Sequence, residues 1–99
     1  MKSIPKHLIN DKTFCVNFLS FVDLEGVRRF MYIAVRGDKM PEFEIALRRG
    51  QFDTEDFGFV LEEGVGQPSD LLKAKMEFLY ECDHRNPLHV YNPPASAAV

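Results

Sequence analysis

Runs of aromatic and β-branched residues predict two β-strands in the first part of the chain. Residues 13–22 (TFCVNFLSFV) and 27–36 (VRRFMYIAVR) consist largely of residue types that favour extended backbone. The connection Asp23-Leu24-Glu25-Gly26 separates the two runs. Two such runs around a short connection that contains glycine predict an antiparallel hairpin.

The two faces of this hairpin carry different side chains, because successive residues of a strand point to opposite sides. In the second run the natural core face consists of Met31, Ile33 and Val35, and the opposite face of Arg28, Phe30, Tyr32 and Arg36. In the first run one face consists of Phe14, Val16 and Phe18, and the other of Cys15, Leu19 and Phe21. Neither side is cleanly polar, so we expect the hairpin to be extended or covered.

Capping residues predict a short helix after the hairpin. Asp38 is a suitable N-cap, Pro41 falls in the first turn, where a missing N–H costs little, and Gly50 ends the helix. One helical face consists of Met40, Phe43, Ala46 and Leu47. Arg48 and Arg49 occupy the last turn, where cations complement the helix dipole.

Residues 53–63 fit two kinds of secondary structure. Asp53-Thr54-Glu55-Asp56 has the acidic residues of a helix start, and the apolar residues Phe57, Val60 and Leu61 follow at helical spacing. A strand would instead align Phe57, Phe59 and Leu61 on one side. We favour the helix because its capping signals agree with it, and the strand remains the alternative.

A last helix is predicted to begin at Pro68-Ser69-Asp70. Its wide apolar arc consists of Leu71, Leu72, Met76, Phe78, Leu79, Tyr80 and Cys82, and its opposite side of Lys73, Ala74, Glu77 and Glu81. Arg85 and Asn86-Pro87 end the helix, and residues 88–91 are a candidate for a further short strand.

The element order ββααα predicts an α+β fold, in which a hairpin is followed by three helices packed on one face of a small sheet. Residues 1–91 are predicted to form a single domain. Residues 1–12 are polar and contain Pro5, so we expect a loosely held arm. Residues 92–99 (NPPASAAV) are expected to form a disordered tail.

The composition is that of an ordinary globular chain, with 45% apolar and 27% charged residues among 99 and a formal net charge of −3. No apolar run approaches the roughly 20 residues that a membrane-spanning helix needs. Cys15 and Cys82 lie far apart, which is unlike the dense cysteine framework of small secreted domains. With no recognisable signal peptide, we expect reduced thiols, a cytoplasmic location and no membrane partner.

Charge is distributed unevenly along the chain. Residues 27–50 contain six basic residues against three acidic ones, a net charge of +3. Residues 51–84 contain nine acidic residues against two lysines, a net charge of −7. Such a chain could pair its halves internally, associate with a second copy or present its basic part to an anionic partner.

Cys82, His84 and His89 form one group of candidate metal ligands. Their spacing matches no strong metal-site template, and no C-x-x-C pair accompanies them. A Cys–His nucleophile would also need an orienting group and an oxyanion site, and the sequence offers neither. We therefore expect no metal, no cofactor and no enzymatic activity, and keep a metal or thiol site at these three residues as an alternative.

The mixed aromatic and basic face of the hairpin is the strongest functional indication. The predicted partner-binding residues are Arg28, Arg29, Phe30, Tyr32, Arg36, Arg48 and Arg49. Three helices on the core face would leave Phe30 and Tyr32 bare, which soluble monomers avoid. We therefore predict a non-catalytic protein-interaction or regulatory module, possible also as a homodimer. The alternative is nucleic-acid binding through the same face, since arginines and rings can contact phosphates and bases.

Overall fold

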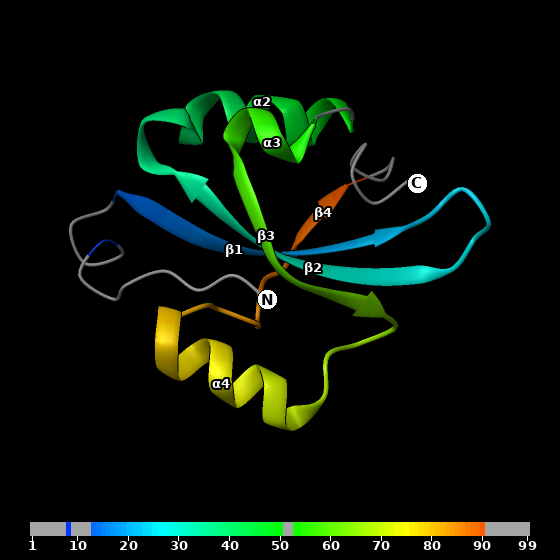
Figure 1. The fold of residues 1–99 in the computed structure, drawn as a ribbon. Helices are drawn as coiled ribbons and strands as arrows, with labels where there is room; N and C mark the ends of the chain where they lie inside the picture. The colour runs from blue at the N-terminus through cyan, green and yellow to red at the C-terminus, as the bar shows by residue number, and fades with distance from the viewer. Residues whose placement is uncertain (1–7, 9–12, 51–52, 91–99) are drawn as a thin grey trace.

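A four-stranded sheet with helices on both sides makes up the fold (Figure 1). The computed structural model describes residues 8, 13–50 and 53–90, with the backbone alone for residues 89 and 90. The strands are β1 (Phe14–Val22), β2 (Arg28–Arg36), β3 (Gly58–Val65) and β4 (Leu88–Val90). The helices are α2 (Met40–Arg49), α3 (Thr54–Phe57) and α4 (Asp70–Tyr80), with a 3-10 turn η1 (Gly37–Lys39) before α2. The predicted α+β class is confirmed.

The predicted hairpin forms the centre of the sheet, whose strand order is β3-β2-β1-β4. β1 and β2 pair antiparallel in one register from Phe14 opposite Arg36 to Val22 opposite Arg28. β3 pairs antiparallel with β2, and β4 pairs parallel with β1. A bulge between Tyr32 and Ile33 interrupts the pairing with β3. The hairpin is thus extended on both edges within one chain.

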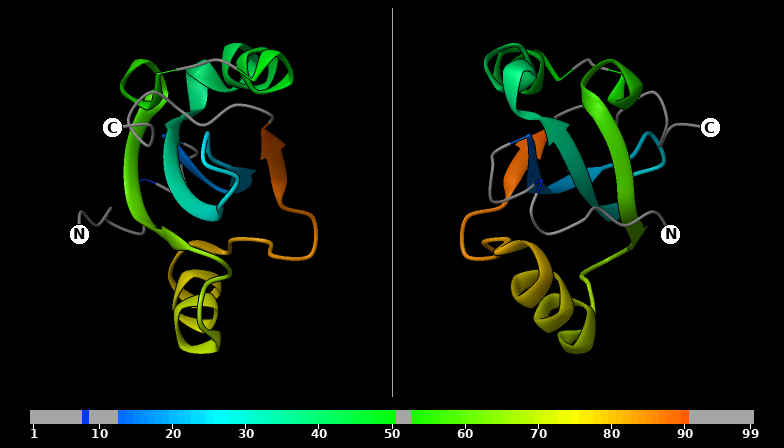
Figure 2. Two further views of the ribbon diagram at one scale, coloured as in Figure 1. Left: turned by 90° about the vertical axis from the view of Figure 1, so that its right-hand side faces the viewer. Right: turned by 60° about the vertical axis from the view of Figure 1, so that its left-hand side comes forward.

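Both faces of the sheet are covered. α2 and α3 lie on one side and α4 on the other, as the two turned views also show (Figure 2). On the α2 side, the core consists of Leu19, Phe21, Met31, Ile33, Val35, Phe43 and Leu47. On the α4 side, it consists of Phe18, Phe30, Tyr32, Ala34, Leu61, Met76, Tyr80 and Cys82. The side chains of β2 therefore alternate between two apolar layers, as the strand period requires.

The hairpin turn is organised by Asp23. Its carboxylate oxygen Oδ1 accepts hydrogen bonds of 2.9 Å from the backbone N–H groups of Glu25 and Val27. Oδ2 accepts a bond of 2.6 Å from Nε of Arg29. The Arg29 guanidinium and the two backbone donors hold the pKa of the Asp23 carboxyl below its ordinary value. Gly26 adopts φ 83°, a left-handed conformation that glycine allows at no steric cost.

The helix ends follow the predicted capping signals in part. Gly50 ends α2 in the left-handed conformation, with φ 69°. Ser69 begins α4, because its side chain accepts a hydrogen bond of 3.1 Å from the N–H of Leu72. Asp38 does not cap α2: it lies within η1, and Lys39 stands at the N-cap without a side-chain bond.

The helix predicted for residues 53–63 is largely wrong. Asp53 does cap a helix, since its side chain accepts from the N–H of Glu55, but this helix, α3, ends at Phe57. The alternative applies from Gly58 onward, where the chain becomes strand β3. Pairing with β2 satisfies the backbone of this segment, and Leu61 is buried on the α4 side.

The predicted order ββααα and the packing of all helices on one face are also wrong. The last two strands interleave with the helices, and α4 packs on the side of the sheet opposite α2. A candidate strand at residues 88–91 was expected, and β4 occupies Leu88–Val90 of it. Most of the predicted arm 1–12, the predicted tail 92–99 and Tyr91 lie outside the described residues.

Across the described residues, the helices are all too short or too polar to cross a membrane.

Replacing Gly58 tests the close approach between β3 and β2. A Cβ atom at this position would lie 1.7 Å from the backbone oxygen of Ala34. We expect Gly58→Ala to lower the free energy of unfolding by about 3 kcal/mol or more, since backbone cannot yield as a side chain does. The control is Gly26→Ala, where no atom lies within 4 Å and only the positive φ costs energy. Equal losses of unfolding free energy in the two variants, measured by urea denaturation, would contradict the close pairing of β3 with β2.

Candidate functional site

The two aromatic rings predicted to bind a partner are buried. Phe30 is 7% exposed and Tyr32 0% exposed, and both belong to the core layer under α4. The expectation that the helices leave these rings bare is therefore wrong. It assumed that all helices pack on the side of Met31, whereas α4 covers the opposite side.

The arginines of β2 do not form one patch. Arg28 and Arg36 stand at opposite ends of the nine-residue strand, about 26 Å apart at the ordinary rise per residue. Nη1 of Arg28 donates to Oγ of Ser20 at 2.7 Å, and Nη2 of Arg36 donates to the backbone oxygen of Asp56 at 2.6 Å. Arg29 lies on the other face of the strand and pairs with Asp23.

Arg48 and Arg49 are exposed at the C-terminal end of α2, on the side of the sheet away from α4. The seven predicted partner-binding residues therefore separate into two buried rings, one arginine at each end of β2, an arginine bound to the hairpin turn and a basic helix end. They do not share a surface, so the face on which the binding prediction rested does not form.

Helix α4 has an exposed apolar side in addition to its buried one. Its inner side places Met76 and Tyr80 in the core. Its outer side places Leu71, Ala74 and Phe78 at positions i, i+3 and i+7, which share one face of a helix. The three are exposed, Leu71 to 82% and Phe78 to 77%. We call these residues the outer stripe. Leu71 and Phe78 belong to the predicted apolar arc of this helix, whereas Ala74 was predicted to lie on the opposite side.

The loop after α4 is held to the sheet by His84. Its Nε2 atom makes a short hydrogen bond with the hydroxyl of Tyr32 on β2. Its Nδ1 atom lies 3.0 Å from Oε1 of Glu77 on α4. The imidazole also packs against the rings of Phe18 and Tyr32, with centroids 5.0 Å and 5.4 Å away. His84 thus joins strand, helix and loop through both of its ring nitrogens.

The surroundings of Tyr32 favour the protonated form of its hydroxyl. Burial raises the pKa of the Tyr32 hydroxyl far above its ordinary value, and the neighbouring Cys82, Glu77 and Glu62 raise it further. The hydroxyl therefore keeps its proton and is hydrogen-bonded to Nε2 of the ring. Nδ1 donates to the Glu77 carboxylate, which can only accept. Neither nitrogen retains a lone pair for a metal ion.

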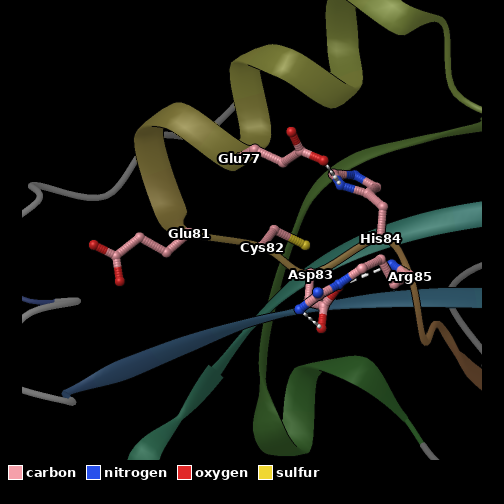
Figure 3. A pocket seen from close by; sticks show the side chains of 6 residues that line it. All are labelled: Glu77, Glu81, Cys82, Asp83, His84 and Arg85. Carbon is pink, nitrogen blue, oxygen red and sulfur yellow. Dashed lines mark hydrogen bonds and ion pairs between the residues drawn. The ribbon is translucent and has the colours of Figure 1, made fainter.

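A pocket of about 380 Å³ opens beside the end of α4. It is lined by Glu77, Glu81, Cys82, Asp83, His84 and Arg85 (Figure 3). Glu77 reaches toward the His84 ring, whereas Glu81 points the opposite way. Nε of Arg85 pairs with the Asp83 carboxylate at 3.1 Å, which lowers the pKa of that carboxyl. Glu81 holds φ 56° at the C-cap, a conformation that usually selects glycine.

Cys82 is a buried thiol in this pocket wall, 4% exposed. Burial raises its pKa to about 12, and the carboxylates of Asp83 and Glu77 add to the shift. The thiolate is the form that attacks substrates and binds metals, and these surroundings oppose it. Within the described residues, no three His, Cys, Asp or Glu side chains gather to hold a metal ion; the side chain of His89 lies outside that description.

Comparison of the chain with models of protein families, with curated proteins and with solved structures gave no match. Its function has therefore to be argued from its own residues. These offer a protonated thiol, an imidazole with both nitrogens engaged and an exposed apolar stripe on a helix.

Alkaline pH tests the burial of Cys82. Below about pH 9, near the ordinary thiol pKa, folded and unfolded chains both keep the proton. Between this value and a folded pKa of about 12, only the unfolded chain loses it, so stability falls as pH rises. We expect melting temperatures to drop from about pH 8 to about pH 10.5, and to drop less in Cys82→Ala. Cys15→Ala is the matched control and should keep the full drop; equal drops in the two variants would contradict the assignment.

Proposed function

We propose that the protein is a small non-catalytic protein-interaction module that binds its partner through the outer stripe of α4. The observation that carries this proposal is the exposure of Leu71 and Phe78 on a helix whose other side already serves the core. Exposed apolar residues that lie together and are bordered by polar residues are typical of a protein interaction site. The chain covers the inner side of α4 with its sheet, and a partner would cover the outer side.

The composition of the stripe supports a protein partner. Phenylalanine at the centre of an interface buries a large rigid surface, and aromatic residues are enriched there. Ala74 lies between Leu71 and Phe78 and is small enough to let a second backbone approach closely. Among the described residues, the other exposed large apolar side chains lie on separate elements: Val22 on β1, Leu24 in the hairpin turn, Ile45 on α2 and Val65 on β3.

Nucleic-acid binding has less support than protein binding. The predicted base-stacking rings Phe30 and Tyr32 are buried, and the arginines beside them are spread over both ends and both faces of β2. The exposed side of α4 carries carboxylates, which repel phosphate.

Site-specific photocrosslinking tests the proposal. A photoreactive phenylalanine analogue at position 71 or 78 should form a covalent adduct with one partner in the native cell, and the analogue at position 24 should not. Leu24 is the matched control because it is 82% exposed, as Leu71 is, but lies in the hairpin turn.

The partner found in this way is then purified and its affinity measured. We expect Phe78→Ala to weaken binding by about tenfold or more, as for an interface anchor, and Leu24→Ala by less than about twofold. Adducts at position 24 alone, or equal effects of the two substitutions, would contradict the proposed surface.

A further inference from the structure

The outer stripe has an acidic border along one side. Asp70 and Glu77 are seven residues apart, so they lie on one side of α4 beside the stripe, and Glu81 follows at the C-cap, where its side chain points away from that of Glu77. The opposite border carries Lys75. Exposed apolar residues with carboxylates on one side are complementary to a surface whose apolar residues are bordered by cations.

From this border we infer that the outer stripe of α4 binds an amphipathic helix whose apolar residues are flanked by lysine or arginine. The inference rests on the proposed function and adds the chemistry of the partner. A helix is the fitting shape because Leu71, Ala74 and Phe78 form a narrow row along an α-helix, into which the side chains of a second helix can pack.

The acidic border is able to pair with incoming cations. Among the described residues, the carboxylates of Asp70 and Glu81 make no ion pair, and both residues are exposed. Glu77 bonds His84 through Oε1 and is itself exposed. The pocket beside Glu77 and Glu81 continues the border past the end of α4 and offers room for a long side chain. Ion pairs at the rim of an apolar contact mainly set orientation and partner choice.

A second copy of this chain in antiparallel packing fits the stripe poorly. A two-fold axis that packs α4 antiparallel against its copy keeps the same border of both helices together. Asp70, Glu77 and Glu81 would then face the same three carboxylates, which repel one another. The exposed apolar area of Leu71 and Phe78 is also small beside the roughly 800 Å² that each partner of a standard interface buries. Anionic lipid surfaces are repelled by the same carboxylates.

Three synthetic peptides test the inference. All carry the same apolar helical row, and their flanking positions are lysine, glutamine or glutamate. Binding to the full chain is measured by fluorescence anisotropy. We expect the lysine peptide to bind about tenfold more tightly than the glutamine peptide in about 50 mM NaCl, and this advantage to shrink severalfold in about 300 mM NaCl. The glutamate peptide should bind most weakly.

Matched variants separate charge from apolar contact. The pair Asp70→Asn/Glu81→Gln should remove most of the lysine peptide's advantage, and the control pair Glu55→Gln/Glu63→Gln, which changes two exposed carboxylates away from α4, should keep it. Phe78→Ala should weaken the binding of all three peptides. Circular dichroism confirms that each variant is folded.

Each contrary result has its own meaning. Equal binding of the lysine and glutamine peptides, with both lost in Phe78→Ala, would overturn the inference and leave the proposed function standing. Absence of peptide binding at millimolar concentration would overturn the inference, and the crosslinking result would then judge the proposed function alone. A light-scattering mass of twice 11.4 kDa that returns to 11.4 kDa in Phe78→Ala would identify a second copy as the occupant and overturn it as well.

Discussion

The burial of β2 on both of its faces is the constraint on which the rest of the molecule depends. Six successive residues of this strand, Phe30–Val35, are buried, and alternate ones enter opposite core layers. A strand of this kind needs a neighbour on each edge and a cover on each face, because its backbone and its side chains are both removed from water. β1 and β3 supply the edges, α2 and α4 the covers.

The same constraint determines which side of α4 stays exposed. α4 packs on the side of Tyr32, where its inner residues Met76 and Tyr80 belong to the core. The bonds of His84 to Tyr32 and Glu77 hold the following loop against the same layer. The outer stripe and its acidic border are what remains of α4 once the core is complete. The proposed binding surface is therefore the side of α4 that does not pack on the sheet, and no residue of the sheet belongs to it.

Local signals in the sequence predicted the hairpin, the division of its side chains between two faces and the end of α2 at Gly50. They failed at residues 58–65, because Phe57, Val60 and Leu61 suit a helix as well as a strand when the run is short. Pairing with β2 decides between them, and this contact is remote in sequence. The exposure of Phe30 and Tyr32 was mispredicted for a related reason: whether a helix covers a given face depends on the path of the chain, which no local pattern specifies.

The candidate site was predictable only in fragments. The apolar arc of α4 was predicted, but Ala74 was assigned to the opposite side of the helix. Which residues of the arc face outward follows only from the position of α4 on the sheet. His84 was noticed as a metal candidate beside Cys82, but its bonds to Tyr32 and Glu77 join residues far apart in the chain.

We propose that α4 has one side for the core and one for a partner. Urea denaturation of two variants tests it most directly. Met76→Ala, on the buried inner side, should lower the free energy of unfolding by about 2–5 kcal/mol. Leu71→Ala/Phe78→Ala, on the outer side, should change it by less than about 1 kcal/mol, because exposed side chains contribute little to folding. A loss in the double variant as large as that in Met76→Ala would show that the outer stripe belongs to the core, and would contradict the account.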